Sequence, residues 1–289
     1  MKLLWLCILA LSPISKAQAI PDIATLMHDV EHNQKASEDL RKHYFYRATT
    51  RTEETDNKGN IKKVETSVSE IFTRKGVIVS RLIEKDGKPL SEKDARKEEE
   101  CIEKDVEKAI KKREKLQAEG KHTNGNGEDV LTISRILELG TFTNPRRETF
   151  KGRPAIVVDY AGDRNAKTRN RFEDVFKLLA GTIWIDEQTR ALVRGEGHVT
   201  DNFHVGGGLL VNVHEGFRFS FEQTYVNNEV WLPSVVEGEG SARIFLFFKI
   251  QGRQRTTFSK YRKFSASATI LPGVTEVKDA PAEETAPQK

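Results

Sequence analysis

Residues 181–201 read GTIWIDEQTRALVRGEGHVTD, and this stretch decides the fold. Both GTIWIDEQ and ALVRGEGHVTD have the composition of strands. Between them, Asp186, Glu187, Gln188 and Thr189 form a polar turn. A connection this short between two strands requires antiparallel pairing. The stretch therefore predicts an antiparallel hairpin.

Similar strands extend from this hairpin in both directions along the chain. Those before it are HYFYRATTRTEET, IKKVETSVSEIFTR, VIVSRLIEK, TFTNPRRETFKG and PAIVVDYAG, and those after it are LLVNVHEGFRFSFEQTYV, EVWLPSVVEGEGSARIFLFFKIQG and RQRTTFSKYRKFSA. Thr, Ser and charged residues on one side of these strands indicate a sheet with one face in water. A sheet of so many strands must curl or close. We therefore predict an α+β protein built on one large, curved antiparallel sheet.

Four segments have the pattern of helices. An amphipathic stripe predicts a helix over 21–40, and shorter helices are expected near 129–140 and 172–179. The longest segment, 91–119, starts with Ser91 as its cap and alternates Lys and Glu around a thin apolar stripe. Because so few of its residues are apolar, we expect one long charged helix on the surface.

The start of the chain resembles a secretory signal. Residues 1–19 combine a positive start, an apolar run and a small-x-small cleavage pattern, with Ala17 and Ala19 at the cleavage site. Cleavage predicts export to the periplasm. It also removes Cys7 and leaves Cys101 as the lone cysteine, so we expect no internal disulfide.

The rest of the chain predicts one domain followed by a tail. Residues 274–289 are rich in Pro, Ala and Glu, as disordered tails are. We expect a single domain over 20–273, in which the charged helix and a flexible loop form an insertion at 91–128. No stretch after the signal has the roughly 18 apolar residues of a spanning helix, so we predict no transmembrane span.

The charges of the mature chain nearly cancel. The chain has 47 Lys and Arg against 43 Asp and Glu, and loss of the signal leaves 45 against 43. Basic and acidic residues alternate along most of the chain, whereas nucleic-acid-binding proteins concentrate unmatched Lys and Arg. We therefore expect no nucleic-acid partner.

The sharpest enzyme-like motif is HDVEH at 28–32, which fits the H-x-x-E-H pattern of zinc peptidases. On a helical wheel, His28 and His32 point away from the apolar stripe and towards water. A catalytic zinc helix lies beneath a cleft instead. We therefore predict no catalytic residues, no metal and no cofactor, and a zinc hydrolase is only the third hypothesis.

Apolar side chains gather on alternate positions of two late strands, in FRFSF at 217–221 and IFLFF at 244–248. They have two interpretations. They form an ordinary core, or they line a groove that the few helices leave uncovered and that suits an apolar ligand. The candidate cavity residues are Trp184, Phe217, Phe219, Phe221, Ile244, Leu246 and Phe248.

The hairpin at 181–194 resembles one found in the outer-membrane lipoprotein-sorting superfamily, which includes the carrier LolA, the receptor LolB and the sigma-factor regulator RseB. Both have a strand, an Asp-x-x-Thr turn and a return strand. The chain is most similar to an uncharacterised exported branch of that superfamily. Further shared signatures are DGKPLS at 86–91, the Gly-rich link at 205–209, WLP at 231–233 and SAR at 241–243.

This resemblance implies a half-open β-barrel with helices on its concave side and a hydrophobic cavity that holds acyl chains. The leading hypothesis is a periplasmic, non-enzymatic binding protein for lipid acyl chains or lipoproteins, active in envelope lipoprotein sorting. The alternative is an RseB-like envelope sensor that acts through a protein partner, with the helix at 91–119 as its docking surface. That helix is a departure from the superfamily pattern.

Overall fold

The structure is a computed structural model of the chain, and it describes residues 19–264 apart from 57, 121–125, 127–132, 172, 207–210 and 245–247. The expected signal segment up to residue 18, the expected tail at 274–289 and most of the expected loop lie outside the described residues. The strands are β1 (Tyr44–Thr55), β2 (Ile61–Arg74), β3 (Val77–Lys85), β4 (Lys88–Pro89), β5 (Gly140–Phe150), β6 (Arg153–Gly162), β7 (Leu179–Asp186), β8 (Leu192–Val199), β9 (Phe203–Val205), β10 (Val211–Val213), β11 (Arg218–Val226), β12 (Val230–Ile244) and β13 (Phe248–Lys263). The helices are α1 (Ile23–Arg41), α2 (Glu92–Ala118), α3 (Ile133–Leu139) and the 3-10 helix η1 (Glu173–Leu178).

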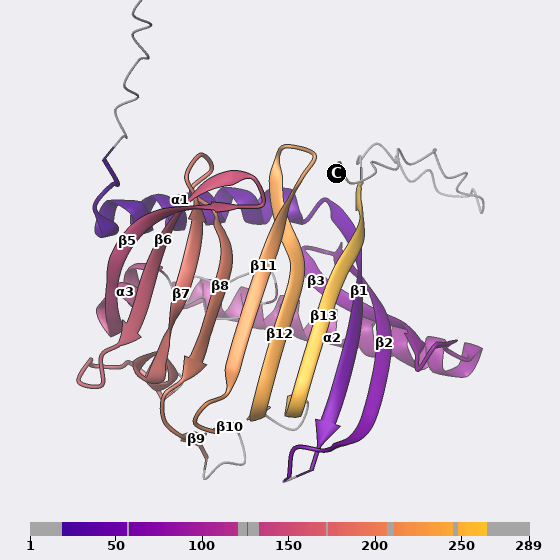
Figure 1. Cartoon of the computed structure of the whole chain (residues 1–289). Helices are drawn as coiled ribbons and strands as arrows, with labels where there is room; N and C mark the ends of the chain where they lie inside the picture. Colours follow the sequence, from indigo (N-terminus) through magenta and orange to yellow (C-terminus); the bar gives the residue numbers. More distant parts are fainter. Residues whose placement is uncertain are drawn as a thin grey trace, which may run out of the picture.

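The strands pair into one antiparallel sheet, in the order β4-β3-β2-β1-β13-β12-β11-β8-β7-β6-β5, with β9 and β10 attached beside β12. The first strand pairs with the last, for example Ala48 with Phe258, so the two halves of the chain are continuous in the sheet. The end strands β4 and β5 do not pair with each other, and the sheet stays open. Figure 1 shows the sheet with α1 and α2 behind it. The predicted fold class, α+β with one large antiparallel sheet, is confirmed, and the sheet is not closed into a barrel.

Helix α1 forms where the apolar stripe predicts it. The side chain of Asp22 caps its start by accepting a hydrogen bond from the Thr25 amide at 3.0 Å. Leu26 and Val30 are buried against Ile156 and other residues of β6 and β7. Full burial of each such side chain contributes about 1.5–3 kcal/mol. This contact fixes α1 on one face of the sheet.

Helix α2 is the predicted long charged surface helix. Its N-cap is Ser91, whose hydroxyl accepts from the Asp94 amide at 3.2 Å. Of its side chains only Ile102 and Val106 are buried, in a small cluster with Val77 and other residues of β2 and β3. The helix therefore covers β3, the strand next to the end strand β4, and leaves most of its charged surface in water.

The two shorter helices form near the predicted positions. In α3, the Arg135 Nη2 donates to Glu173 Oε2 of η1 at 2.8 Å, and both side chains are buried. The Tyr160 hydroxyl of β6 donates to the Phe176 carbonyl of η1 at 3.1 Å. These contacts hold both helices to the sheet.

One predicted strand boundary is wrong. We expected IFLFFKIQG to continue a single strand and the chain to turn near Gly252. The structure ends β12 at Ile244 and begins β13 at Phe248, and these two residues pair across the two strands. Gly252 instead lies inside β13 opposite Gly240, with φ of 125° and 122° respectively, so both glycines serve an irregularity within the strands. Similarly, the expected strand at 209–226 is divided into β10 and β11.

Candidate ligand-binding site

The sheet has two chemically different faces. We call the face towards α1 the inner face. Ile183 packs against the α1 cluster, and the pairing carries this face from Ile183 to Gly195, then to Phe221 and then to Val236. The opposite, outer face carries a row of polar side chains in register, in which charge alternates towards β13: His198, Arg218, Glu239 and Arg253. All four are exposed, as the predicted wet face requires.

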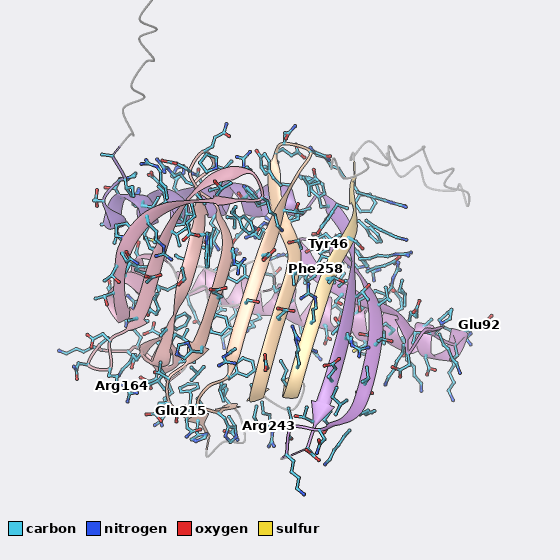
Figure 2. The ribbon with its side chains drawn as sticks, viewed as in Figure 1. Tyr46, Glu92, Arg164, Glu215, Arg243 and Phe258 are labelled. Atoms are coloured by element: carbon cyan, nitrogen blue, oxygen red, sulfur yellow. The ribbon has the colours of Figure 1, made fainter. Side chains whose placement is uncertain are left out.

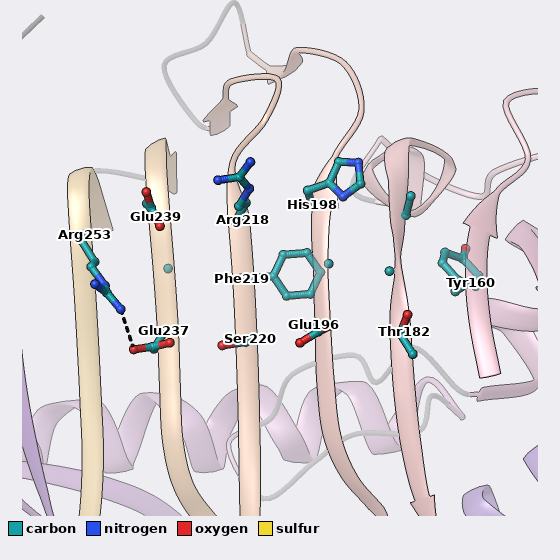
Figure 3. Close-up of a pocket in the computed structure, with 14 residues that line it drawn as sticks. Tyr160, Thr182, Glu196, His198, Arg218, Phe219, Ser220, Glu237, Glu239 and Arg253 are labelled. Atoms are coloured by element: carbon teal, nitrogen blue, oxygen red, sulfur yellow. Dashed lines mark hydrogen bonds and ion pairs between the residues drawn. The ribbon is translucent and has the colours of Figure 1, made fainter. Parts of the chain in front are cut away.

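A row of three glycines and one phenylalanine crosses the inner face. Gly181, Gly197, Phe219 and Gly238 are successive partners across β7, β8, β11 and β12. A hollow of about 610 Å³ is lined by this row, by Tyr160 and by residues of the outer face, among them His198, Arg218, Glu239 and Arg253. We call it the glycine hollow; Figure 3 shows its lining, with Phe219 between the strands that carry Arg218 and His198.

The glycines of β8 make room for the aromatic rings of β11. A Cβ on Gly195 would lie 2.5 Å from Cε1 of Phe221, and a Cβ on Gly197 would lie 2.9 Å from Cζ of Phe219. Real Cβ atoms essentially never come so close, so both rings depend on these glycines. The matching spacing, Gly-x-Gly opposite Phe-x-Phe, is a sequence signal that could have found this contact.

A second pocket, of about 290 Å³, lies where Phe221 and Val236 meet the end of α1. We call it the Arg41 pocket. Ile78 and Val236 are 46% and 42% exposed, unusual values for large aliphatic side chains beside a pocket. Its lining includes Arg41, Tyr46, Ile71, Ile78, Phe221 and Val236.

Arg41 is the one cation of the described residues that lines this pocket. Its Nε donates to the Trp231 carbonyl at 3.0 Å, and its Nη2 donates to Gln223 Oε1 at 2.8 Å. Burial lowers the pKa of Arg41, partly offset by Tyr46 and Glu38. An arginine nevertheless stays charged in a protein. The sequence offered no signal for this site beyond a basic residue in the last turn of the helix.

The aromatic and aliphatic candidates are distributed over both faces. Phe219 lines the glycine hollow and Phe221 the Arg41 pocket. Phe217 packs against a buried cluster that contains Val199 and Phe203. Ile244 and Phe248 are paired in the sheet, and Leu246 lies outside the described residues.

Trp184 lies on the outer face, away from the three phenylalanines. It packs in a buried cluster with Val157 and Trp231. Its Nε1 donates to Glu148 Oε2 at 2.9 Å, and the Arg194 guanidinium lies 4.7 Å from its ring centroid. The structure therefore does not bring Trp184 together with the other candidates.

The two histidines of the HDVEH motif are exposed on α1, while Leu26, Met27 and Val30 of the same helix are buried. Glu31 of the motif accepts a hydrogen bond from the Ser134 amide at 3.0 Å. Across the described residues, no three His, Cys, Asp or Glu side chains gather in a group that could hold a metal. Nor does any helix in that part of the chain have the length and apolar character to cross a membrane.

No protein-family model matches this sequence, and no curated protein is significantly similar to it. Solved structures with a similar arrangement do exist. A domain from Vibrio parahaemolyticus named for outer membrane lipoprotein sorting is 9% identical, with a TM-score of 0.35 over 84% of this chain and 95% of that one. A LolA superfamily protein from Nitrosomonas europaea is 7% identical, with a TM-score of 0.32 over 82% and 94%. A DUF1329 family protein from Desulfovibrio piger is 8% identical, with a TM-score of 0.33 over 85% and 95%.

The first two structures carry names from the superfamily that the hairpin at 181–194 resembles. At these identities and TM-scores, the likeness is no argument about what the chain binds or does. The function must therefore be argued from its own inner face.

Proposed function

We propose that the chain is a periplasmic, non-enzymatic binding protein whose inner face holds the acyl chains of a lipid or lipoprotein. The observation that carries this proposal is the Arg41 pocket, where exposed apolar side chains surround a concave space. Apolar area removed from water is worth roughly 25 cal/mol per Å². An acyl chain that covers Ile78 and Val236 gains this energy, and a polar ligand does not.

The alternating charges of the outer face support the same proposal. Glu237 accepts from Arg253 at 3.2 Å, and Arg194 Nη1 donates to Glu222 Oε1 at 3.2 Å, so many outer charges are already paired within the sheet. An exposed, internally paired face is suited to water. The inner face is therefore the better candidate for an apolar ligand.

The proposal is tested with protein purified from envelope extract under non-denaturing conditions. Native mass spectrometry is expected to detect a co-purifying lipid, and the delipidated protein is expected to take up a fluorescent fatty acid. Val236→Glu places a charge in the pocket wall and should abolish uptake. The matched control is Val64→Glu, at a valine that is 40% exposed and lines neither pocket, and it should leave uptake unchanged. Absence of both a co-purifying lipid and fatty-acid uptake would overturn the proposal.

A further inference from the structure

The Arg41 pocket combines apolar walls with a positive charge that forms no ion pair with an acid of the described residues. Resting on the proposed acyl-chain function, we propose that this pocket binds a single-chain fatty acid, whose carboxylate is held by Arg41 and Tyr46. The acyl chain lies against Ile71, Phe221 and Val236. The inference concerns the ligand's headgroup, which the apolar walls alone do not specify.

Arg41 differs from two other arginines that bind side chains within the fold, because those two form ion pairs. Arg153 forms an ion pair with Asp186 at 2.7 Å, and Arg135 forms one with Glu173 at 2.8 Å. Among the described residues no carboxylate forms an ion pair with Arg41, whose partners are a carbonyl and an amide oxygen. Arg41 is partly buried, and a charge withdrawn from water is normally paired because its desolvation is costly. The missing counter-charge is what an anionic ligand supplies.

The one acid among the residues that line the pocket is Glu222, whose carboxylate is already neutralised by its outer-face ion pairs. Glu222 Oε2 lies 3.2 Å from Lys151 Nζ, and its Oε1 accepts from Arg194 Nη1 at the same distance. Glu38 acts on Arg41 through charge alone and is not hydrogen-bonded to it. The electrostatic character of the pocket is therefore set by Arg41.

Arg41 has donors left for a carboxylate. A guanidinium has more N–H groups than the two that bind Trp231 and Gln223, and Nη1 has no partner among the described residues. The planar arrangement of these groups matches the two oxygens of a carboxylate. The two existing bonds hold the guanidinium in place, so little rotamer entropy is lost when the ligand binds.

Tyr46 supplies the second donor. Its ring is held by Phe258 and Tyr261, at centroid distances of 5.9 and 5.8 Å, and Figure 2 shows Tyr46 beside Phe258. Its hydroxyl has no hydrogen-bond partner among the described residues, whereas the hydroxyls of Tyr44, Tyr160 and Tyr261 each have at least one. Tyr46 and Arg41 both line this pocket, so one bound anion faces donors from both side chains.

The apolar walls of the Arg41 pocket define where the acyl chain of the ligand lies. Tyr46 pairs with Ile71 across β1 and β2, and Phe221 pairs with Val236 across β11 and β12, so these side chains share the inner face. Phe219 lies two residues from Phe221 on the same face. The apolar wall for a longer acyl chain therefore continues from the Arg41 pocket to the Phe219 ring.

The test compares ligands that differ only in the headgroup, by isothermal titration calorimetry of the full mature chain at about pH 8, where a carboxylic acid is ionised. Dodecanoate is expected to bind the wild type about tenfold more tightly than dodecanol, as a charge-assisted hydrogen-bonded pair would. Arg41→Gln should bring the ratio of the two affinities to about one. Tyr46→Phe should reduce the ratio and leave dodecanol binding unchanged.

Lys42→Gln is the matched control, because it removes a positive charge from the residue next to Arg41. The Lys42 side chain pairs with Asp39 at 2.6 Å and does not line the pocket. It should keep the wild-type ratio. Equal binding of dodecanoate and dodecanol by the wild type would overturn the inference and leave the proposed function standing, whereas binding of neither would overturn the proposed function. Tighter binding of dodecyl phosphate than of dodecanoate would overturn the assignment to a carboxylate. The wild-type comparison decides these points even if Arg41→Gln does not fold.

Discussion

Gly197 of β8 lies directly opposite Phe219 of β11, and the Phe219 ring occupies the space that a side chain at 197 would need. A Cβ at that position would be 2.9 Å from the ring and 2.7 Å from the carbonyl oxygen of Ala180 on the other neighbouring strand. The glycine thus permits both the aromatic inner face and the close approach of the strands.

Gly197→Ala is expected to lower the free energy of unfolding by about 1–3 kcal/mol, because overpacking forces the ring or the backbone to move. Urea denaturation followed by circular dichroism measures the change. Ser220→Ala, on the outer face of the same region, should change it by less than about 0.5 kcal/mol. A Gly197→Ala variant as stable as the wild type would show that the Phe219 ring does not lie where we place it.

Asp186 makes stability depend on acid pH. Burial raises its pKa, but hydrogen bonds from Arg153 and Thr189 outweigh burial and hold the pKa below the ordinary value of 3.8. A carboxyl with a lowered pKa contributes stability above its unfolded pKa and loses it as the pH falls through its folded pKa.

Asp186→Asn should therefore cost about 2 kcal/mol at neutral pH, the scale of hydrogen bonds to a charged group. The difference between wild type and variant should shrink below about pH 4. Thermal unfolding between neutral and acid pH checks both points. A constant difference across this range would contradict the role of the Asp186 charge.

Ile102 anchors α2 on the edge of the sheet. It is 6% exposed and packs with Val77 and Val79. Ile102→Ala should lower the free energy of unfolding by about 2 kcal/mol or more, the usual cost of such a cavity. The adjacent Cys101 is exposed, so Cys101→Ala is a matched control that should have almost no effect. Equal stability of the two variants, measured by denaturant unfolding, would mean that α2 is not docked on β3.

Tyr160 makes the stability of the fold depend on alkaline pH. Burial raises its pKa to about 12, and its hydroxyl donates to the Phe176 carbonyl at 3.1 Å. A raised pKa contributes stability that is complete below the unfolded value near 10 and is lost as the pH rises towards 12.

Tyr160→Phe should cost about 1 kcal/mol at neutral pH and weaken the alkaline loss of stability. Tyr225→Phe serves as the control. The Tyr225 hydroxyl donates to the Asn228 carbonyl in an exposed turn, so this change should leave the alkaline loss of stability as it is in the wild type. The tyrosinate absorbance of the folded protein, followed against pH, provides an independent reading. Ionisation of all tyrosines near pH 10 would contradict the burial of Tyr160.

Elements with local causes could be predicted closely. Helix α1 follows from an apolar stripe and a cap at Asp22, and the turn after β7 follows from Asp186, whose side chain accepts from the Thr189 amide at 2.7 Å. Both causes act within a few residues of the chain. The boundary near Gly252 could not be predicted in this way, because a glycine serves equally in a turn and in an irregular pair inside a sheet, as it does here opposite Gly240.

Which residues form the candidate site depends on contacts between residues far apart in the sequence. Trp184 and Phe219 both occupy strands of alternating pattern, yet they face opposite sides of the sheet. Alternation places side chains on two faces but does not say which face is covered, and a single register shift reverses the assignment. One such shift falls between Trp184 and Ile185.

The sequence by itself determined the class of the fold: long polar-faced strands joined by short turns, an amphipathic first helix and a long charged helix. These properties follow from residue spacing, capping and turn chemistry, which are local. Only the tertiary structure decided the inner face and its pocket. Arg41, Tyr46 and Phe221 come from three separate elements, and they meet because β1 pairs with β13 and so joins the first strands to the last. Strand order and register depend on the burial of side chains far apart in the chain, and no local pattern specifies them.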